Sequence, residues 1–293
     1  MSDEFDNLDR LGHGIARFSG RPAAAVTILL AAAVIVSWLL LLVMAGGAAQ
    51  VLPPREAGPG MSALEGFGWP GLVEAGRLFA QLCLSPGIPD LSGPARFAAL
   101  AAMWFLMAVA TMLPSAAPMI RTYCEIADTA RGRGRCVVHP RVFVAGYLGV
   151  WLAAAGAFAG LSVAIQTGLA AGSRPLDGIA GAVMLAIAGL WQFTPMKDAC
   201  LRRCRAPFAT LFGRWTDRPA GVLRLGAEQG LWCLGCCWAL MLVMFVVGLM
   251  NIFWMALAGV FAIVEKQGRG KTASRVAGAI LLVWATALLV VSL

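Results

Sequence analysis

Charged residues are scarce in this chain. Only 13% of its 293 residues are Asp, Glu, Lys or Arg, whereas a soluble domain carries about 25%. Hydrophobic residues make up 60%, and the mean hydropathy is +0.79. Several apolar runs approach or exceed the roughly 20 residues that cross a bilayer as a helix. These totals exclude an ordinary soluble protein and predict an all-α, polytopic membrane protein with a single transmembrane domain over residues 1–293.

The chain has only two histidines, and its acidic residues lie outside the middle of the expected spans. The two histidines, His13 and His139, both fall outside the expected spans. A transmembrane bis-histidine haem is therefore excluded, and a histidine-based diiron or copper-oxidase centre is not expected. No acidic residue falls in the middle of an expected span. A conventional ion-coupled antiporter is disfavoured for this reason, since a proton or sodium relay usually needs an intramembrane acid.

Motifs for energy coupling and for export are missing too. The chain has neither a P-loop nor a DKTGT-like phosphorylation motif, so it is not expected to be an ATP-driven pump by itself. The acidic start MSDEFDNLDR, with no small-residue cleavage site after the first apolar run, predicts a retained anchor and not a cleaved signal peptide. The net charge of +8 does not indicate nucleic acid as a partner, because membrane topology accounts for the basic residues.

About seven apolar segments predict transmembrane helices. The longest apolar run, 231–264, would extend about 51 Å as one helix, far beyond a bilayer core of about 30 Å. We therefore predict two helices separated by a turn at 248–251. The predicted spans are approximately 22–44, 96–120, 142–169, 179–193, 228–248, 250–264 and 276–293.

The positions of lysine and arginine predict the orientation. With seven spans and a cytosolic N-terminus, 19 of the 23 Lys and Arg fall on the cytosolic side, as the positive-inside rule requires. The C-terminus is then periplasmic. Cytosolic loops are predicted at 121–141, 195–224 and 265–275. A periplasmic loop at 45–95 contains an amphipathic segment near 71–84, which fits either an interfacial helix or an ordinary packed surface helix.

Cysteines gather in two segments on the predicted cytosolic side. Cys233, Cys236 and Cys237 begin the fifth span with i, i+3 and i+4 spacing, which puts them on one helix face. Cys200 and Cys204 lie one turn apart among basic residues, and cations favour the thiolate form that binds metals. Thiolates and thioethers are the ligands that soft metal ions prefer. Three methionines are candidate additional ligands: Met112, Met196 and Met241.

Each cysteine segment also has a simpler interpretation. A free cysteine often serves as a small buried hydrophobic residue, so the thiols of the fifth span are also compatible with core packing. The basic segment is equally compatible with an interfacial amphipathic helix whose arginines meet lipid phosphates. Both alternatives stay open on the sequence alone.

Three long segments resemble a known family. They are MWFLMAVATMLPSAAP at 103–118, QFTPMKDACLRRCRAPF at 192–208 and GAEQGLWCLGCCWALMLVMFVVGLMNIFWMALAGVFAIVEK at 226–266. All three are similar to a bacterial family of integral membrane proteins of unknown function, described as predicted metal-binding. The resemblance implies a multi-pass protein of the bacterial inner membrane. It also implies a metal ligand set drawn from Cys200, Cys204, Cys233, Cys236 and Cys237.

Three functions are compatible with these features. The first is binding of a soft transition metal, with Cu(I) as first choice and Zn(II) as second, for transport, sensing or delivery. The second is a thiol redox protein that uses Cys236/Cys237 and Cys200/Cys204. The third is a structural or assembly subunit of a larger membrane complex. The expected partners are the lipid bilayer and either a metal donor or acceptor protein or a larger membrane complex. No catalytic residue is identified, so an enzyme is not favoured.

Overall fold

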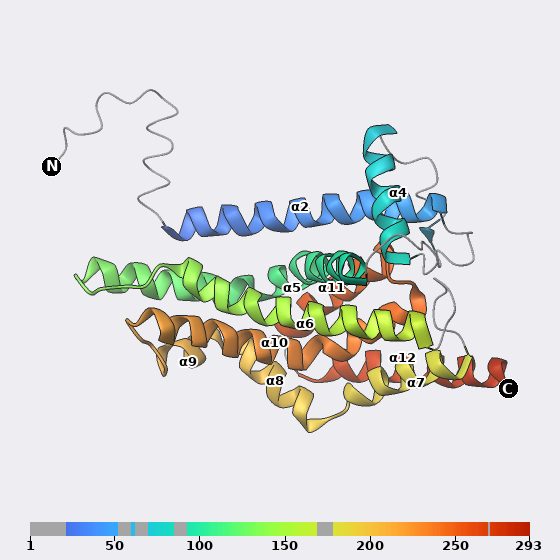
Figure 1. The fold of residues 1–293 in the computed structure, drawn as a ribbon. Helices are drawn as coiled ribbons and strands as arrows, with labels where there is room; N and C mark the ends of the chain where they lie inside the picture. Colours follow the sequence, from blue (N-terminus) through green and yellow to red (C-terminus); the bar gives the residue numbers. More distant parts are fainter. Residues whose placement is uncertain (1–21, 52–59, 62–69, 85–92, 169–177, 269) are drawn as a thin grey trace.

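A bundle of long helices forms the molecule, as Figure 1 shows. The computed structural model describes residues 22–51, 60–61, 70–84, 93–168, 178–268 and 270–293, and within these ranges the chain forms helices and no strand. The prediction of an all-α fold is therefore confirmed. In chain order the helices are α2 (Pro22–Val51), α4 (Pro70–Leu84), α5 (Gly93–Gly132), α6 (Pro140–Gly168), α7 (Gly178–Trp191), α8 (Pro195–Arg205), α9 (Pro207–Phe212), α10 (Pro219–Val247), α11 (Ile252–Gln267) and α12 (Thr272–Ser292).

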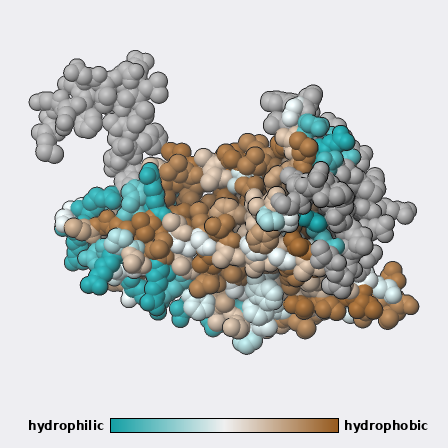
Figure 2. All heavy atoms as spheres, viewed as in Figure 1, coloured by the Kyte–Doolittle hydropathy of each residue, from teal (hydrophilic) through white to brown (hydrophobic). Residues whose placement is uncertain are grey.

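Five of the described helices are long and apolar enough to cross a membrane, namely α2, α5, α6, α10 and α12. A sixth span results if α7 and α8, which meet at a 60° bend, count as one broken span. The predicted number of seven and the orientation of the termini stay predictions. In Figure 2 the middle of the visible face is mostly hydrophobic, whereas hydrophilic residues gather at the end where α9 lies and around α4. Such a pattern is typical of a membrane protein.

The predicted break in the longest apolar run is confirmed, but helix α5 runs further than predicted. Gly248 adopts a positive φ of 105°, and the side chain of Asn251 caps α11 by accepting a hydrogen bond from the backbone N–H of Trp254. Helix α5 continues to Gly132, so the first part of the predicted loop 121–141 is helical. Its 40 residues extend about 60 Å, well beyond a bilayer core.

The predicted loops on either side of the membrane also contain helices. The amphipathic segment near 71–84 forms α4, which packs directly on α2: a Cβ atom on Gly76 would lie 2.1 Å from the carbonyl oxygen of Val43. This contact favours a packed surface helix for α4 over a separate interfacial one. The predicted cytosolic loop 195–224 contains α8, α9 and the start of α10.

Close contact between α6 and α10 depends on two glycines. A Cβ atom on Gly226 of α10 would lie 2.0 Å from the carbonyl oxygen of Phe143, and one on Gly146 of α6 would lie 2.1 Å from that of Leu223. Only glycine allows the two backbones to approach so closely. The contact brings Tyr147, the residue after Gly146, against α10.

A tryptophan of α2 compensates for a proline of α5. Pro114 has no N–H, so it cannot bond the carbonyl oxygen of Ala110, four residues earlier. The indole N–H of Trp38 donates a hydrogen bond to that oxygen at 3.1 Å. An apolar helix can therefore contain a proline without leaving a buried carbonyl unpaired.

Candidate metal-binding site

Three thiols of α10 form the centre of the candidate site. Cys233, Cys236 and Cys237 are all buried, and all three are free thiols. The sulfur of Cys236 lies 3.2 Å from that of Cys237, and the Cys236 thiol donates a hydrogen bond to the carbonyl oxygen of Cys233 at 3.1 Å. The cluster therefore points into the protein, where water has little access to the sulfur atoms.

Helix α8 brings two further thiols to this cluster. Thr194 caps α8 by accepting a hydrogen bond from the backbone N–H of Lys197. The sulfur of Cys200 packs on Gly235 of α10, where a Cβ atom would lie only 2.7 Å from it. The sulfur of Cys204 accepts a hydrogen bond from the side-chain amide of Gln229 of α10 at 3.8 Å. The two cysteine segments, about 30 residues apart in the sequence, therefore meet in space.

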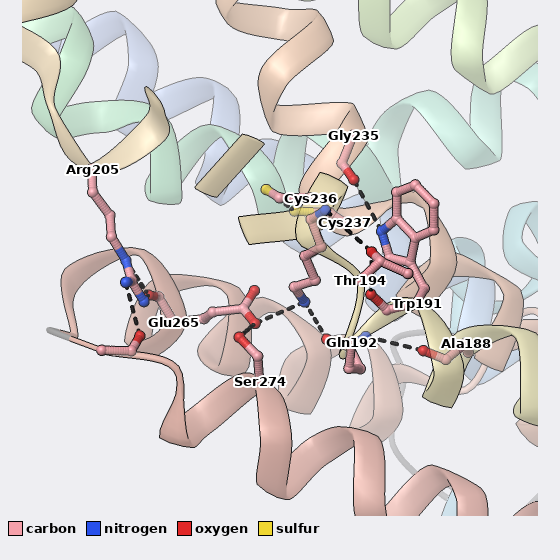
Figure 3. A network of polar contacts seen from close by, with 12 residues as sticks. Ala188, Trp191, Gln192, Thr194, Arg205, Gly235, Cys236, Cys237, Glu265 and Ser274 are labelled. Atoms are coloured by element: carbon pink, nitrogen blue, oxygen red, sulfur yellow. Dashed lines mark hydrogen bonds and ion pairs between the residues drawn. The ribbon is translucent and has the colours of Figure 1, made fainter. Parts of the chain in front are cut away.

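A buried ion pair holds α8 in this position. The Nζ atom of Lys197, near the start of α8, lies 2.7 Å from the carboxylate of Glu265 on α11, and their side chains are 0% and 1% exposed. Arg205, the last residue of α8, donates two hydrogen bonds to the backbone carbonyl oxygen of the same Glu265, at 3.1 and 2.6 Å. Both ends of α8 are fixed to this one residue, and Figure 3 shows the contact between Arg205 and Glu265. Glu265 therefore sets how Cys200 and Cys204 face α10.

Residues of α12 and of the turn after α7 belong to the same network. Ser274 of α12 donates to the Glu265 carboxylate at 2.6 Å (Figure 3), and the amide oxygen of Gln192 accepts a hydrogen bond from Lys197. The second carboxylate oxygen of Glu265 is buried and has no hydrogen-bond partner among the described residues. The network lies inside the protein although it is near the predicted cytosolic end of the bundle.

A second buried cation, Lys266, contacts the thiol cluster directly. Lys266, 8% exposed, donates hydrogen bonds to the sulfur of Cys233 at 3.0 Å and to the hydroxyl of Ser115 at 2.6 Å. The hydroxyl of Tyr147 also hydrogen-bonds with Cys233, at 3.1 Å, and donates to the carbonyl oxygen of Met112 at 3.2 Å. Side chains from α5, α6, α10 and α11 therefore converge at Cys233.

The three candidate methionines differ in position. Met112 is buried, and its backbone carbonyl contacts Tyr147, which in turn contacts Cys233. Met241 is buried one turn after Cys237 on α10. Met196 is 65% exposed. Because its side chain faces away from the buried thiols, we leave Met196 out of the proposed ligand set.

Sequence reasoning missed the buried charges Lys197, Glu265 and Lys266. It placed Lys197 in the predicted cytosolic loop 195–224, and Glu265 and Lys266 in the predicted loop 265–275. One signal was available: Glu265 and Lys266 are adjacent and of opposite charge, and they follow an apolar run. Neighbouring residues on a helix point in different directions. In the structure Glu265 accordingly meets α8, whereas Lys266 meets α10.

A family model matches the chain, although no metal-binding group is formed among the described residues. Among the described residues, no group of three or more His, Cys, Asp or Glu side chains is arranged to hold a metal ion. Residues 101–288 match a family model with the description "PpoB2: Copper chaperone". This match covers more than half of the chain and includes all five candidate cysteines. No curated protein and no solved structure matches the chain.

Proposed function

The chain belongs to the PpoB2 family, described as copper chaperones, and from this premise we propose that it holds Cu(I) as cargo at the junction of α8 and α10. The proposed ligands are thiolates of Cys204, Cys233, Cys236 and Cys237, with Cys200 beside them. Thiolates and thioethers select Cu(I) over harder ions. Cu(I) is satisfied by two or three sulfur ligands, so the close pair Cys236 and Cys237 provides a minimal site.

One observation carries the proposal. The sulfur of Cys200 on α8 packs on Gly235, the residue before Cys236 on α10, and the sulfur of Cys204 accepts a hydrogen bond from Gln229 of α10. Thiols used only as small core residues would have no reason to meet across two helices, since free cysteine packs as well against aliphatic side chains. Met112 and Met241, both buried, are additional thioether ligands in this proposal.

We further propose where the site lies and what it serves. By the distribution of Lys and Arg, the thiols lie near the cytosolic face of a bacterial inner membrane, with the N-terminus inside and the C-terminus outside. A chaperone passes its metal to another protein, so an acceptor protein or a larger membrane complex is the proposed partner. Exchange between thiolates suits such a transfer, because a ligand of the acceptor can replace one ligand of the donor at a time.

Copper content tests the proposal. The full chain, purified in detergent and loaded with Cu(I) under reducing conditions, is expected to retain about one copper per chain against a chromophoric Cu(I) chelator. Cys236→Ser combined with Cys237→Ser is expected to weaken retention at least about 100-fold, because a hydroxyl is a poor ligand for a soft ion. The measurement is copper per protein by elemental analysis after chelator titration.

Cys136→Ser is the matched control, since Cys136 is exposed in the segment between α5 and α6. It is expected to bind copper as the wild type does. Equal copper content in wild type and the double variant would contradict the proposed function. Reversible oxidation of Cys236 and Cys237 without bound metal would favour the thiol redox alternative, and stable copurification of a partner without metal would favour an assembly subunit.

A further inference from the structure

A fixed positive charge lies inside the thiol cluster. The ammonium of Lys266 donates to Cys233, and it interacts electrostatically with Cys236, Cys237 and Tyr147 as well. Among the described residues no carboxylate forms an ion pair with Lys266; the adjacent carboxylate of Glu265 pairs with Lys197 instead. The groups that can balance the charge of Lys266 are therefore the thiols themselves.

An ammonium is an unusual neighbour for a cation site. Two like charges repel each other more strongly inside a protein than in water, because the effective dielectric constant is lower. The ammonium of Lys266 would therefore repel a bare metal ion. A metal complex with a net negative charge would instead be attracted by the ammonium. Because the ammonium is buried, salt screens this attraction only weakly.

The charge of the complex depends on the metal. Two thiolates around a monovalent ion carry a net charge of −1, whereas two thiolates around a divalent ion carry no net charge. Three thiolates carry a net charge of −2 around a monovalent ion and −1 around a divalent ion, so the monovalent complex is more negative by one unit with either number of ligands. The ammonium of Lys266 therefore stabilises the monovalent complex more than the divalent one.

We propose that Lys266 is a specificity-determining residue whose ammonium selects the thiolate complex of a monovalent soft ion over the less negative complex of a divalent ion. The inference rests on the proposed function and deepens it. It assigns the preference for Cu(I) over Zn(II) to a charge beside the ligands as well as to the softness of sulfur. Ser115 and Tyr147 position the pair, because Ser115 accepts from the ammonium and Tyr147 contacts the Cys233 thiol.

The affinities of the wild type and two variants for Cu(I) and Zn(II) test this assignment. Wild type, Lys266→Met and Lys266→Arg, each as the full chain in detergent, are titrated with Cu(I) against a chromophoric Cu(I) chelator and with Zn(II) against a chromophoric zinc chelator. Lys266→Met is expected to lower the ratio of Cu(I) to Zn(II) affinity at least about tenfold, a cautious fraction of the charge interaction. Lys266→Arg keeps the charge and is expected to keep most of the ratio.

The ratio separates selection from a merely structural role. A structural role would lower both affinities together, so an unchanged ratio in Lys266→Met would overturn the inference. Lys266→Gln, which lacks the charge and keeps a donor for Ser115, gives the same comparison if the Met variant does not fold. Failure of the wild type to bind Cu(I) through its thiols would overturn the proposed function, whereas thiol-dependent Cu(I) binding with an unchanged ratio would overturn only the role of Lys266.

Discussion

Replacing Lys197 with Met is expected to lower the free energy of unfolding by about 3–5 kcal/mol. The ammonium of Lys197 lies 2.7 Å from the carboxylate of Glu265, and both side chains are almost fully buried. Without it, the carboxylate remains inside the protein with the Ser274 hydroxyl as its donor. A buried charge without its partner costs much more than the intact pair contributes. Unfolding in mixed detergent micelles, followed by circular dichroism, measures the loss.

Two further variants make this result specific. Arg131→Ala removes an exposed ion pair with Asp128, whose side chains are 46% and 38% exposed, and is expected to cost less than about 1 kcal/mol. Lys197→Met combined with Glu265→Gln removes both buried charges and keeps a partner for Ser274, so it is expected to recover most of the stability. A single variant that loses no more than Arg131→Ala would contradict the burial of this pair.

Gly226→Ala is expected to have the next largest effect, a loss of about 1–3 kcal/mol. The new methyl group would lie 2.0 Å from the carbonyl oxygen of Phe143. That neighbour is backbone, so α6 and α10 must separate to make room. Their separation also moves Tyr147 away from Cys233, so we expect weaker Cu(I) retention in the same variant. Thermal unfolding in detergent and the chelator titration measure the two effects.

Gly149→Ala is the matched control for this packing. Gly149 lies on the same helix as Gly146, but nothing lies within 4 Å of a Cβ atom built on it. Alanine favours a helix by about 1 kcal/mol over glycine, so the control is expected to be neutral or slightly stabilising. Similar losses in both variants would show that the contact between α6 and α10 does not depend on Gly226.

The sequence was sufficient for the all-α fold, for the break in the longest apolar run and for the common helix face of the three thiols of α10. The length of the apolar run at 231–264 exceeded a bilayer, and the break after Gly248 appears where that argument predicted it. The spacing of the three thiols on α10 put them on one helix face, and all three are buried. Spacing is a local property, which is why it could be interpreted without knowing the neighbouring helices.

The charges inside the bundle could not be predicted in the same way. Lys197 and Lys266 each occur near the end of an apolar segment, where a basic residue normally meets water or lipid headgroups. Here the end of α11 is covered by α8 and α12, which supply Lys197 and Ser274 as partners for Glu265. Burial of a helix end depends on tertiary contacts, which hydropathy does not encode. The extension of α5 to Gly132 has a related cause, since residues 121–132 contain good helix formers and no proline or glycine before the end.

X-ray absorption spectroscopy of the copper-loaded full chain tests the central claim most directly, namely that sulfur atoms of α8 and α10 share one Cu(I) ion. We predict a shell of two or three sulfur atoms with no nitrogen or oxygen, and a shell with fewer sulfur atoms in Cys204→Ser or in Cys236→Ser. A shell dominated by nitrogen or oxygen, or a sulfur shell that is identical in wild type and both variants, would contradict the account.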